Sequence, residues 1–536
     1  MRKMSKALSE DSRILNRLAG EKGITRRAFM ERASALGALS IAATIWQGRE
    51  AKAEQVKGGH VKVGVGAGET SDTLAIGGLG GAHNQVIVES IRSKLVEVRN
   101  DGGLEPDLAT EWDASDKGKT WTFKLRKGVE FHNGKSLTPQ DVIDSMNLSR
   151  GEDSTRGGAS MLKVVEDIKP DGNNVVFKLS EASADFPFYL SQNLFGIGPS
   201  IDGKVDESGV GTGPFVLEEF NPGVRGIGKR NPNYFMDGKP YFDSFEVLSV
   251  RSAAAASSAL MTNELHVIQP VDPNTASRLN EAPGVSVLSV AGGSTITMPM
   301  HADKEPFSNK DFRLAMKYAI DREEMRDKVF FGHASLANDH PFPTFDKFYN
   351  PDIPQRHYDP EKAKFHAKKS GMADAKVQLH ASDAAFLGSV DAAVLFSENA
   401  KKAGLNVEVV REPIDGYWSN VWSKVPFSYS YWAGRPTPDM MLSVAYVCNA
   451  AWGDTNWCDR KFTDLVSAAR AELDYDKRKV LYAEVQQILH DEGSTIVPLF
   501  QNILHGINDK IDTGGEVLGT QLLDSFRIFK KWSFKA

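Results

Sequence analysis

The alternation of apolar and polar positions predicts strands and helices that follow one another along the chain. Residues 61–65 alternate in the manner of a strand, and residues 66–81 form a stretch rich in glycine, serine and threonine. Residues 84–98 carry apolar side chains at helical spacing and end in a short strand, before a turn at residues 100–103. The glycine-rich stretch lacks a G-x-G-x-x-G spacing with a following acidic residue, so we expect no nucleotide cofactor.

A hairpin and a capped helix are predicted between residues 108 and 142. Alternating strands turn at Gly118, and a further turn lies at Gly134. Thr138 then precedes a helix with Pro139 at its first position and Asp141 in its first turn, the usual order at a helix N-terminus.

The second half of the chain repeats the alternation of helix and strand. Apolar spacing predicts helices at 311–328 and 389–402, and Gly404 separates the second helix from a strand at 407–410. A helix, a glycine and a strand in this order are typical of an α/β fold.

Composition and charge narrow the class of protein. The chain has 536 residues, of which 41% are hydrophobic and 25% charged, as in folded, water-soluble proteins of two or three domains. Of the net charge of −6, residues 1–53 contribute +6 and the remainder −12. A body this acidic excludes nucleic acid as a partner, because phosphates require a basic surface.

The basic N-terminal segment has the features of an export signal. Arg26-Arg27 precedes a run of apolar and small residues at 33–46, and Ala-Lys-Ala at 51–53 offers a cleavage site. We expect a signal peptide of the twin-arginine type over residues 1–53. No cysteine for a lipid anchor lies near the cleavage site, and no later apolar run approaches the ~20 residues that span a bilayer. The mature protein is therefore expected to be soluble in the periplasm and not a lipoprotein.

The chain contains two cysteines, Cys448 and Cys458. An oxidising compartment favours a disulfide between them, and the alternative is a pair of unlinked buried thiols. Two thiols without a neighbouring histidine are a poor metal site, so we expect no bound metal.

Five blocks of sequence occur in a fixed order over nearly all of the mature chain. They lie at residues 108–142, 211–235, 306–322, 358–364 and 482–499. These blocks resemble those of the family-5 bacterial extracellular solute-binding proteins, which bind dipeptides, oligopeptides, nickel, glutathione and opines. His132 belongs to the first block and is expected to have a structural role.

The resemblance implies a two-lobe periplasmic binding protein of type II, in the large cluster with an extra subdomain in the first lobe. Lobe I is expected at 54–297 and 504–536, with the inserted subdomain at about 83–216, and lobe II at 298–503, with the ligand cleft between the lobes. It implies a monomeric receptor of an ABC importer that captures a peptide-like or amino-acid-derived solute by lobe closure. The receptor then delivers the solute to permease subunits in the inner membrane.

Other functions are left as alternatives. A receptor for nickel, a metal chelate or another small solute belongs to the same family. A secreted hydrolase is less favoured, because the sequence lacks a G-x-S-x-G elbow, an H-E-x-x-H motif and a P-loop. A periplasmic chaperone or a purely structural role is similarly disfavoured as an alternative function. We therefore expect no enzyme activity and no cofactor.

The most informative candidate contact is Arg435. In peptide-binding relatives the corresponding segment, just after a tryptophan, often carries an aspartate that pairs with the α-ammonium group of the peptide. The arginine here favours a carboxylate instead, held by the guanidinium fork. The structural alternative is an ion pair between Arg435 and Asp439 or a neighbouring acid.

Further candidate contacts lie on either side of this residue. Trp432, Trp452, Asp454 and Trp457 combine aromatic and polar groups, a composition suited to a pocket wall, although tryptophan is equally a core residue. A disulfide would hold the base of this loop.

A second polar cluster contains Asp339 and His340. Asp339 is expected to take the ammonium group that Arg435 cannot bind, and the alternative is a turn in which the polar side chains bind local backbone.

Overall fold

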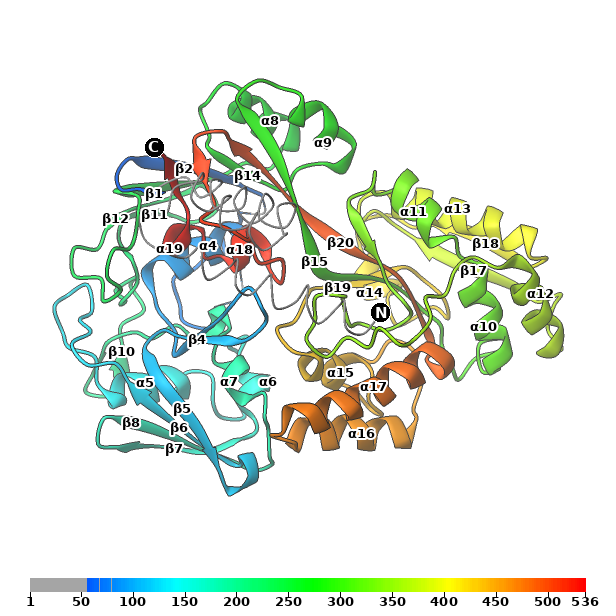
Figure 1. Ribbon diagram of the computed structural model, residues 1–536, viewed down its shortest axis with the longest axis horizontal. Coiled ribbons are helices and arrows are strands. Elements are labelled where there is room, and N and C mark those ends of the chain that lie inside the picture. Colours follow the sequence, from blue (N-terminus) through cyan, green and yellow to red (C-terminus); the bar gives the residue numbers. More distant parts are fainter. Residues whose placement is uncertain (1–54, 67, 79) are drawn as a thin grey trace, which may run out of the picture.

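The computed structural model describes residues 55–66, 68–78 and 80–536. The expected signal peptide, with Arg26 and Arg27, lies outside the described residues. The described chain forms a mixed α/β fold in which two bodies are joined by two long strands (Figure 1).

The first body is built on one half of a mixed nine-stranded sheet with the order β11-β12-β13-β2-β14-β20-β15-β19, in which β16 also pairs with β20. Its strands are β2 (His60–Val65), β11 (Phe215–Asn221), β12 (Arg225–Arg230), β13 (Ser244–Ser249) and β14 (Val267–Gln269). The predicted strand at 61–65 is therefore found, and it runs parallel to both β13 and β14. Its position inside the sheet explains why Val61, Val63 and Val65 are all buried.

Helices and the C-terminal segment cover this half of the sheet. They are α4 (Ala82–Ile91), α8 (Ala253–Met261), α9 (Pro273–Asn280), α18 (Leu522–Ser525) and α19 (Ile528–Lys531). A small sheet joins β1 (Gln55–Val56), β22 (Ser533–Lys535) and β21 (Ile511–Asp512). Trp532 and Phe529 of the C-terminal segment are buried in the same core as Val63. The C-terminus therefore returns to the body in which the described chain begins.

An inserted subdomain packs beside the first body. Its four-stranded sheet has the order β5-β6-β8-β7, with β5 (Ala109–Ser115), β6 (Thr120–Leu125), β7 (Val165–Asp171) and β8 (Asn174–Leu179). Its helices are α5 (Pro139–Asn147), α6 (Ala159–Leu162) and α7 (Phe186–Tyr189), and 3-10 turns η1 (Asp116–Gly118) and η2 (Asn193–Phe195) complete it. Short strand pairs are β3 (Val96–Val98) with β4 (Leu104–Pro106), and β9 (Ser200–Ile201) with β10 (Lys204–Val205).

The predicted hairpin and helix of this subdomain are confirmed. Strands β5 and β6 turn at Gly118, whose φ of +86° suits glycine. Helix α5 begins at Pro139 behind a capping box formed by Thr138 and Asp141.

The second body carries eight α-helices of the described chain. They are α10 (Lys310–Tyr318), α11 (Arg322–Lys328), α12 (Pro360–Lys369), α13 (Ser389–Lys402), α14 (Tyr417–Asn420), α15 (Pro438–Ala445), α16 (Arg460–Ala471) and α17 (Tyr475–Glu492). Its strands are β16 (Ala334–Leu336), the parallel pair β17 (Lys376–Ala381) and β18 (Asn406–Arg411), and β19 (Ser430–Trp432). The predicted helix at 389–402 and the strand that follows Gly404 are both present.

The single helix predicted at 311–328 is wrong. The structure breaks it into α10 and α11, because Asp321 leaves the helical conformation and caps the second helix. The carboxylate of Asp321 accepts a hydrogen bond of 2.8 Å from the backbone N–H of Glu324.

Strands β15 (Val285–Pro299) and β20 (Thr495–Asn508) run antiparallel from the first body into the second (Figure 1). Their pairing is interrupted between Val290 and Ser294, where β15 bulges. Gly292 lies in this bulge, where a Cβ atom would stand 2.1 Å from the carbonyl oxygen of Gln501. The expected lobe boundaries at 297/298 and 503/504 fall within these shared strands and stay predictions.

Candidate functional site

Three adjoining hollows lie where the first body, the second body and the C-terminal segment meet, and all three include Thr520. We call them together the interlobe cleft. The first hollow is lined among others by Val98, Asn100, Asp346, Lys347, Arg435 and Thr437. The second includes Glu89, Lys94, Glu97, Pro436 and Arg527, and the third includes Gln269, Tyr431, Gly434 and Gln501. The segment that follows β19 therefore contributes to every hollow.

Arg435 lies in the first hollow and is half-buried. Burial lowers the pKa of its guanidinium group. Among the described residues no carboxylate pairs with it, and Asp439, the partner considered from the sequence, instead accepts a hydrogen bond of 3.0 Å from Arg470 Nε. Arg435 thus combines partial loss of water with an unused guanidinium fork, which is the condition for binding an anionic group.

A left-handed turn forms the C-terminal edge of the cleft. Residues Leu523 to Phe526 have φ angles between 52° and 64°, a conformation that costs about 1–2 kcal/mol per residue. Hydrogen bonds hold it: the Leu523 N–H donates to His505 Nε2 at 3.0 Å, and the hydroxyls of Thr520 and Ser525 lie 2.8 Å apart. Strained turns of this kind concentrate at ligand sites.

The structure adds three residues to the candidate contacts: Thr437 from the segment around Arg435 that the sequence suggested, and Asp346 and Lys347 from a loop that it did not suggest. Asp346 and Lys347 follow a proline-rich segment without regular structure, and both are half-buried in the first hollow. Burial raises the pKa of Asp346 to about 6 and lowers the pKa of Lys347. The Thr437 hydroxyl is buried in the same hollow without a hydrogen-bond partner among the described residues. In the sequence, Asp346 and Lys347 are marked only by adjacent opposite charges after a proline-rich stretch. Such a pattern is too common to indicate a binding site.

Asp339 lies inside the second body and not in the three hollows. It is 2% exposed, and its carboxylate binds Arg322 at 2.8 Å and also Arg356. Burial alone would raise the pKa of Asp339, but the charges of Arg322 and Arg356 outweigh it and hold the pKa well below its usual range. Both oxygens are therefore engaged, which leaves none for a solute ammonium group.

His340 is also buried, and its Nδ1 accepts a hydrogen bond of 3.4 Å from the Phe342 N–H. Burial lowers the pKa of His340 to about 3, so the ring is neutral at physiological pH. Its neighbour Pro341, and not His340 itself, lines the cleft.

The tryptophans form one aromatic cluster on the second body. Trp432 is 6% exposed and belongs to the core, and the half-exposed ring of Trp452 stacks on it with 6.1 Å between centroids. Trp457 packs edge-on against Phe462. Asp454 is buried and accepts a hydrogen bond of 3.1 Å from the indole N–H of Trp422. Of the expected contacts in this part of the described chain, only Arg435 lines the three hollows.

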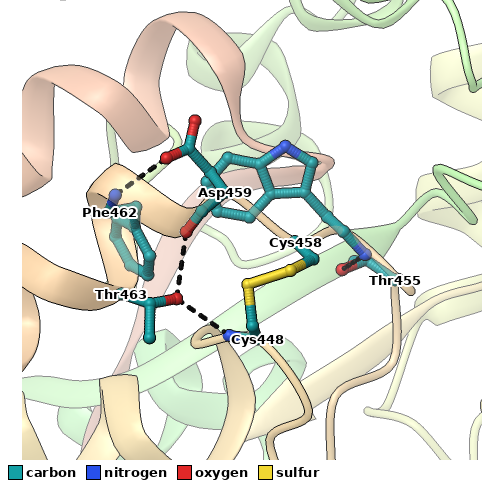
Figure 2. The surroundings of a disulfide bond; sticks show 7 residues. Cys448, Thr455, Cys458, Asp459, Phe462 and Thr463 are labelled. Atoms are coloured by element: carbon teal, nitrogen blue, oxygen red, sulfur yellow. Dashed lines mark hydrogen bonds between the residues drawn. A yellow bond between two sulfur atoms is a disulfide. The ribbon is translucent and has the colours of Figure 1, made fainter.

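Cys448 and Cys458 are joined by a disulfide (Figure 2). The Cys448 N–H donates to Thr463 Oγ1 at 3.1 Å, and that hydroxyl donates to the Asp459 carbonyl at 2.9 Å. Asp459 in turn caps helix α16 by accepting the Phe462 N–H at 2.8 Å. The bridge therefore fastens the loop that carries Trp452 and Asp454 to the start of α16.

Two α/β bodies joined by crossing strands, with a cleft between them, define a type II periplasmic binding protein. The chain belongs to the family described as bacterial extracellular solute-binding proteins, family 5, whose sequence profile for the middle region matches residues 103–454. It is the solute-binding component of an ABC importer. Across the described residues 55–536, leaving aside 67 and 79, no helix has the length and apolar character needed to cross a membrane.

Known proteins that resemble the chain agree with this assignment. It is 25% identical over 450 residues to the dipeptide-binding protein of Escherichia coli (strain K12). This alignment covers 76% of this chain and 82% of the dipeptide-binding protein. The structure matches the periplasmic binding protein DppA of Helicobacter pylori in complex with the peptide STSA, with a TM-score of 0.71, 23% identity and coverage of 91% and 100%. It also matches HbpA2 of Haemophilus parasuis, with a TM-score of 0.78, 19% identity and coverage of 89% and 100%. The two structural matches support the fold.

Proposed function

We propose that this protein is a periplasmic receptor, without enzyme activity of its own, that captures a peptide-like or amino-acid-derived solute bearing a carboxylate. It works as a monomer and delivers the solute to the permease subunits of its importer. The observation that carries the proposal is the half-buried guanidinium of Arg435, which lines the interlobe cleft without an acidic partner among the described residues.

Partial loss of water makes Arg435 favour a carboxylate. A guanidinium that has lost part of its hydration gains most from an anion that presents two oxygens to its paired N–H groups. The second hollow lacks such a vacant cation, because Lys94 pairs with Glu89 at 2.5 Å and Arg527 with Asp524 at 3.1 Å. Among the described residues, Arg435 is thus a cation of the cleft wall whose guanidinium fork has no carboxylate partner.

Capture by closure is the second part of the proposal. The bulge of β15 lies on one of the two strands that join the bodies, and closure around a solute shields charged contacts from water. The dipeptide-binding protein of Escherichia coli and the complex of DppA with a peptide support a peptide-like solute.

Export through the twin-arginine route completes the proposal. Arg26-Arg27 before an apolar run supports this route, and the absence of a cysteine near the cleavage site at 51–53 supports a mature protein without a lipid anchor.

The test compares an acid with its amide. A thermal-shift screen of dipeptides, opines, glutathione and metal chelates, on protein refolded free of metal and ligand, supplies the tightest carboxylate solute. Calorimetry then measures this acid and its carboxyl-amidated analogue on wild type, Arg435→Ala, Arg435→Lys and Arg460→Ala. Arg460 is an exposed arginine of α16 and serves as the matched control.

Arg435→Ala is expected to weaken binding of the acid about tenfold to a hundredfold, the effect of one charged hydrogen-bonded contact. Arg435→Lys should restore part of the loss, since an ammonium cannot make the paired fork. Arg460→Ala should change nothing. If Arg435→Ala weakens acid and amide equally, the arginine is structural and the carboxylate assignment fails.

A further inference from the structure

Asp346 is a carboxylate in the interlobe cleft without a cationic partner. Its Oδ1 accepts a hydrogen bond of 2.7 Å from the Phe348 N–H, and among the described residues no other group donates to either oxygen. The side chain is half-buried, and Asp346 shares the lining of the first hollow with Arg435. Burial raises the pKa of Asp346, which means that the ionised carboxylate is only partly stabilised by the protein groups around it.

Two cations, Arg478 and Lys347, lie near Asp346. Arg478 pairs with Asp185 at 2.8 Å. The ammonium of Lys347 lies 4.9 Å and 5.1 Å from the ring centres of Phe188 and Phe348. None of these cations forms an ion pair with Asp346 in the described part of the chain, so its negative charge is available to a ligand.

The first hollow thus offers three kinds of contact at once. Among the residues that the structure describes, Arg435 and Lys347 are cations without carboxylate partners, Asp346 is an anion without a cation, and the buried hydroxyl of Thr437 lacks a hydrogen-bond partner. The charges sum to +1, and opposite charges that share one lining yet do not pair are best compensated by a solute that carries both signs.

We propose that the solute is an amino dicarboxylate, an amino acid derivative with two acidic groups and one protonated amine. One carboxylate lies on Arg435, the second faces Lys347, and the ammonium group donates to Asp346. This inference rests on the proposed function, because it takes the carboxylate contact of Arg435 as given. It makes Asp346 the residue that selects solutes with a protonated amine.

The test uses L-alanyl-L-glutamate and N-(1-carboxyethyl)-L-alanine as zwitterionic probes, and N-acetyl-L-alanyl-L-glutamate as the probe without an ammonium group. Calorimetry compares wild type, Asp346→Asn and Asp352→Asn. Asparagine keeps the acceptor for the Phe348 N–H and removes the charge, and Asp352 is an exposed aspartate of the same loop that serves as the control. Thermal unfolding confirms that each variant is folded.

Asp346→Asn is expected to weaken both zwitterions about tenfold or more, the effect of losing one charge-assisted contact, and to leave the acetylated probe unchanged. Asp352→Asn should alter none of them. Equal weakening of zwitterion and acetylated probe overturns the inference, and so does equal affinity of wild type for both. Failure of both zwitterions to bind also overturns it, whereas the carboxylate proposal falls only if no acid in the screen depends on Arg435.

Discussion

Asp185 of the inserted subdomain and Arg478 of α17 form an ion pair of 2.8 Å between the subdomain and the second body. Their side chains are 0% and 6% exposed, so the pair is closed to water. Beside it, Tyr189 Oη donates to Asp439 Oδ2 at 3.1 Å, and the Ala184 N–H donates to the Arg470 carbonyl at 2.8 Å. Any opening of the cleft on this side must break these contacts and hydrate their charges.

Removing one partner should therefore open the cleft. In Asp185→Asn the charge of Arg478 is uncompensated while buried, at a cost of about 3 kcal/mol or more, and the lobes avoid this cost by separating. Such a cost shifts the balance of open and closed forms roughly a hundredfold. Solution scattering should show a larger radius of gyration than for wild type. Asp153→Asn, at an exposed aspartate of the same subdomain, is the control. An unchanged radius of gyration in Asp185→Asn would show that the ion pair of Asp185 and Arg478 does not hold the cleft closed.

The disulfide should contribute to stability and to the position of its loop. Cys448 and Cys458 are separated by 10 residues, and a bridge over a loop of this size contributes about 2–4 kcal/mol. The double variant Cys448→Ala, Cys458→Ala should lose this amount in urea unfolding, and reductant should lower the stability of wild type but not of the variant. A double variant as stable as oxidised wild type would show that the contacts of Thr463 and Asp459 suffice.

Stability should depend on pH through Asp454. Burial raises the pKa of Asp454 to about 6, so between its usual value of 3.8 and about 6 the folded state binds more protons than the unfolded state. Its contribution to stability is therefore lost as the pH rises through this range, by up to about 3 kcal/mol. Asp454→Asn should stabilise the protein at pH 7 and flatten the profile of urea stability in this range. The control Asp415→Asn, at an exposed aspartate, should not raise the stability comparably. If Asp454→Asn is less stable than wild type at pH 7, the ionised Asp454 does not destabilise the folded protein and the prediction is wrong.

Export should depend on the paired arginines. Replacing Arg26 and Arg27 by lysine is expected to leave the precursor in the cytoplasm, since the twin-arginine route requires the pair. Immunoblots of periplasmic and cytoplasmic fractions measure the distribution. Arg13→Lys with Arg17→Lys, in the same segment but outside the motif, should export normally. Unchanged periplasmic accumulation of the first variant would point to the general secretory route.

Local signals explain why much of the fold could be predicted. The helix Ser389–Lys402, the turn at Gly118 and the capping box of Thr138 each depend on neighbours a few residues away, so their patterns are complete in the sequence. The break between α10 and α11 was missed because the helix indicated by the apolar spacing from Phe312 to Ile320 was extended past the point where that spacing ends. Asp321, the next residue, leaves the helical conformation and caps α11.

From the sequence, the lining of the cleft could be predicted only for residues that lie close together in one segment of the chain. Arg435 lies close after β19 and lines the first hollow, and its contact with a solute stays a prediction, whereas Asp346 joins the same hollow from a distant loop whose sequence has no periodic pattern. Asp339 was expected to bind an ammonium group because the sequence does not show that Arg322 and Arg356 fold onto its carboxylate. In β19 the alternation of a strand puts Trp432 in the core and leaves Tyr431 43% exposed in the third hollow.

A crystal structure with the tightest acid from the screen decides whether a solute carboxylate binds Arg435 between the lobes. We expect two carboxylate oxygens at about 2.7–2.9 Å from the guanidinium nitrogens of Arg435, with the solute enclosed by both lobes. A solute bound outside the interlobe cleft, or an Arg435 that contacts only protein groups while the carboxylate lies elsewhere, would contradict this expectation.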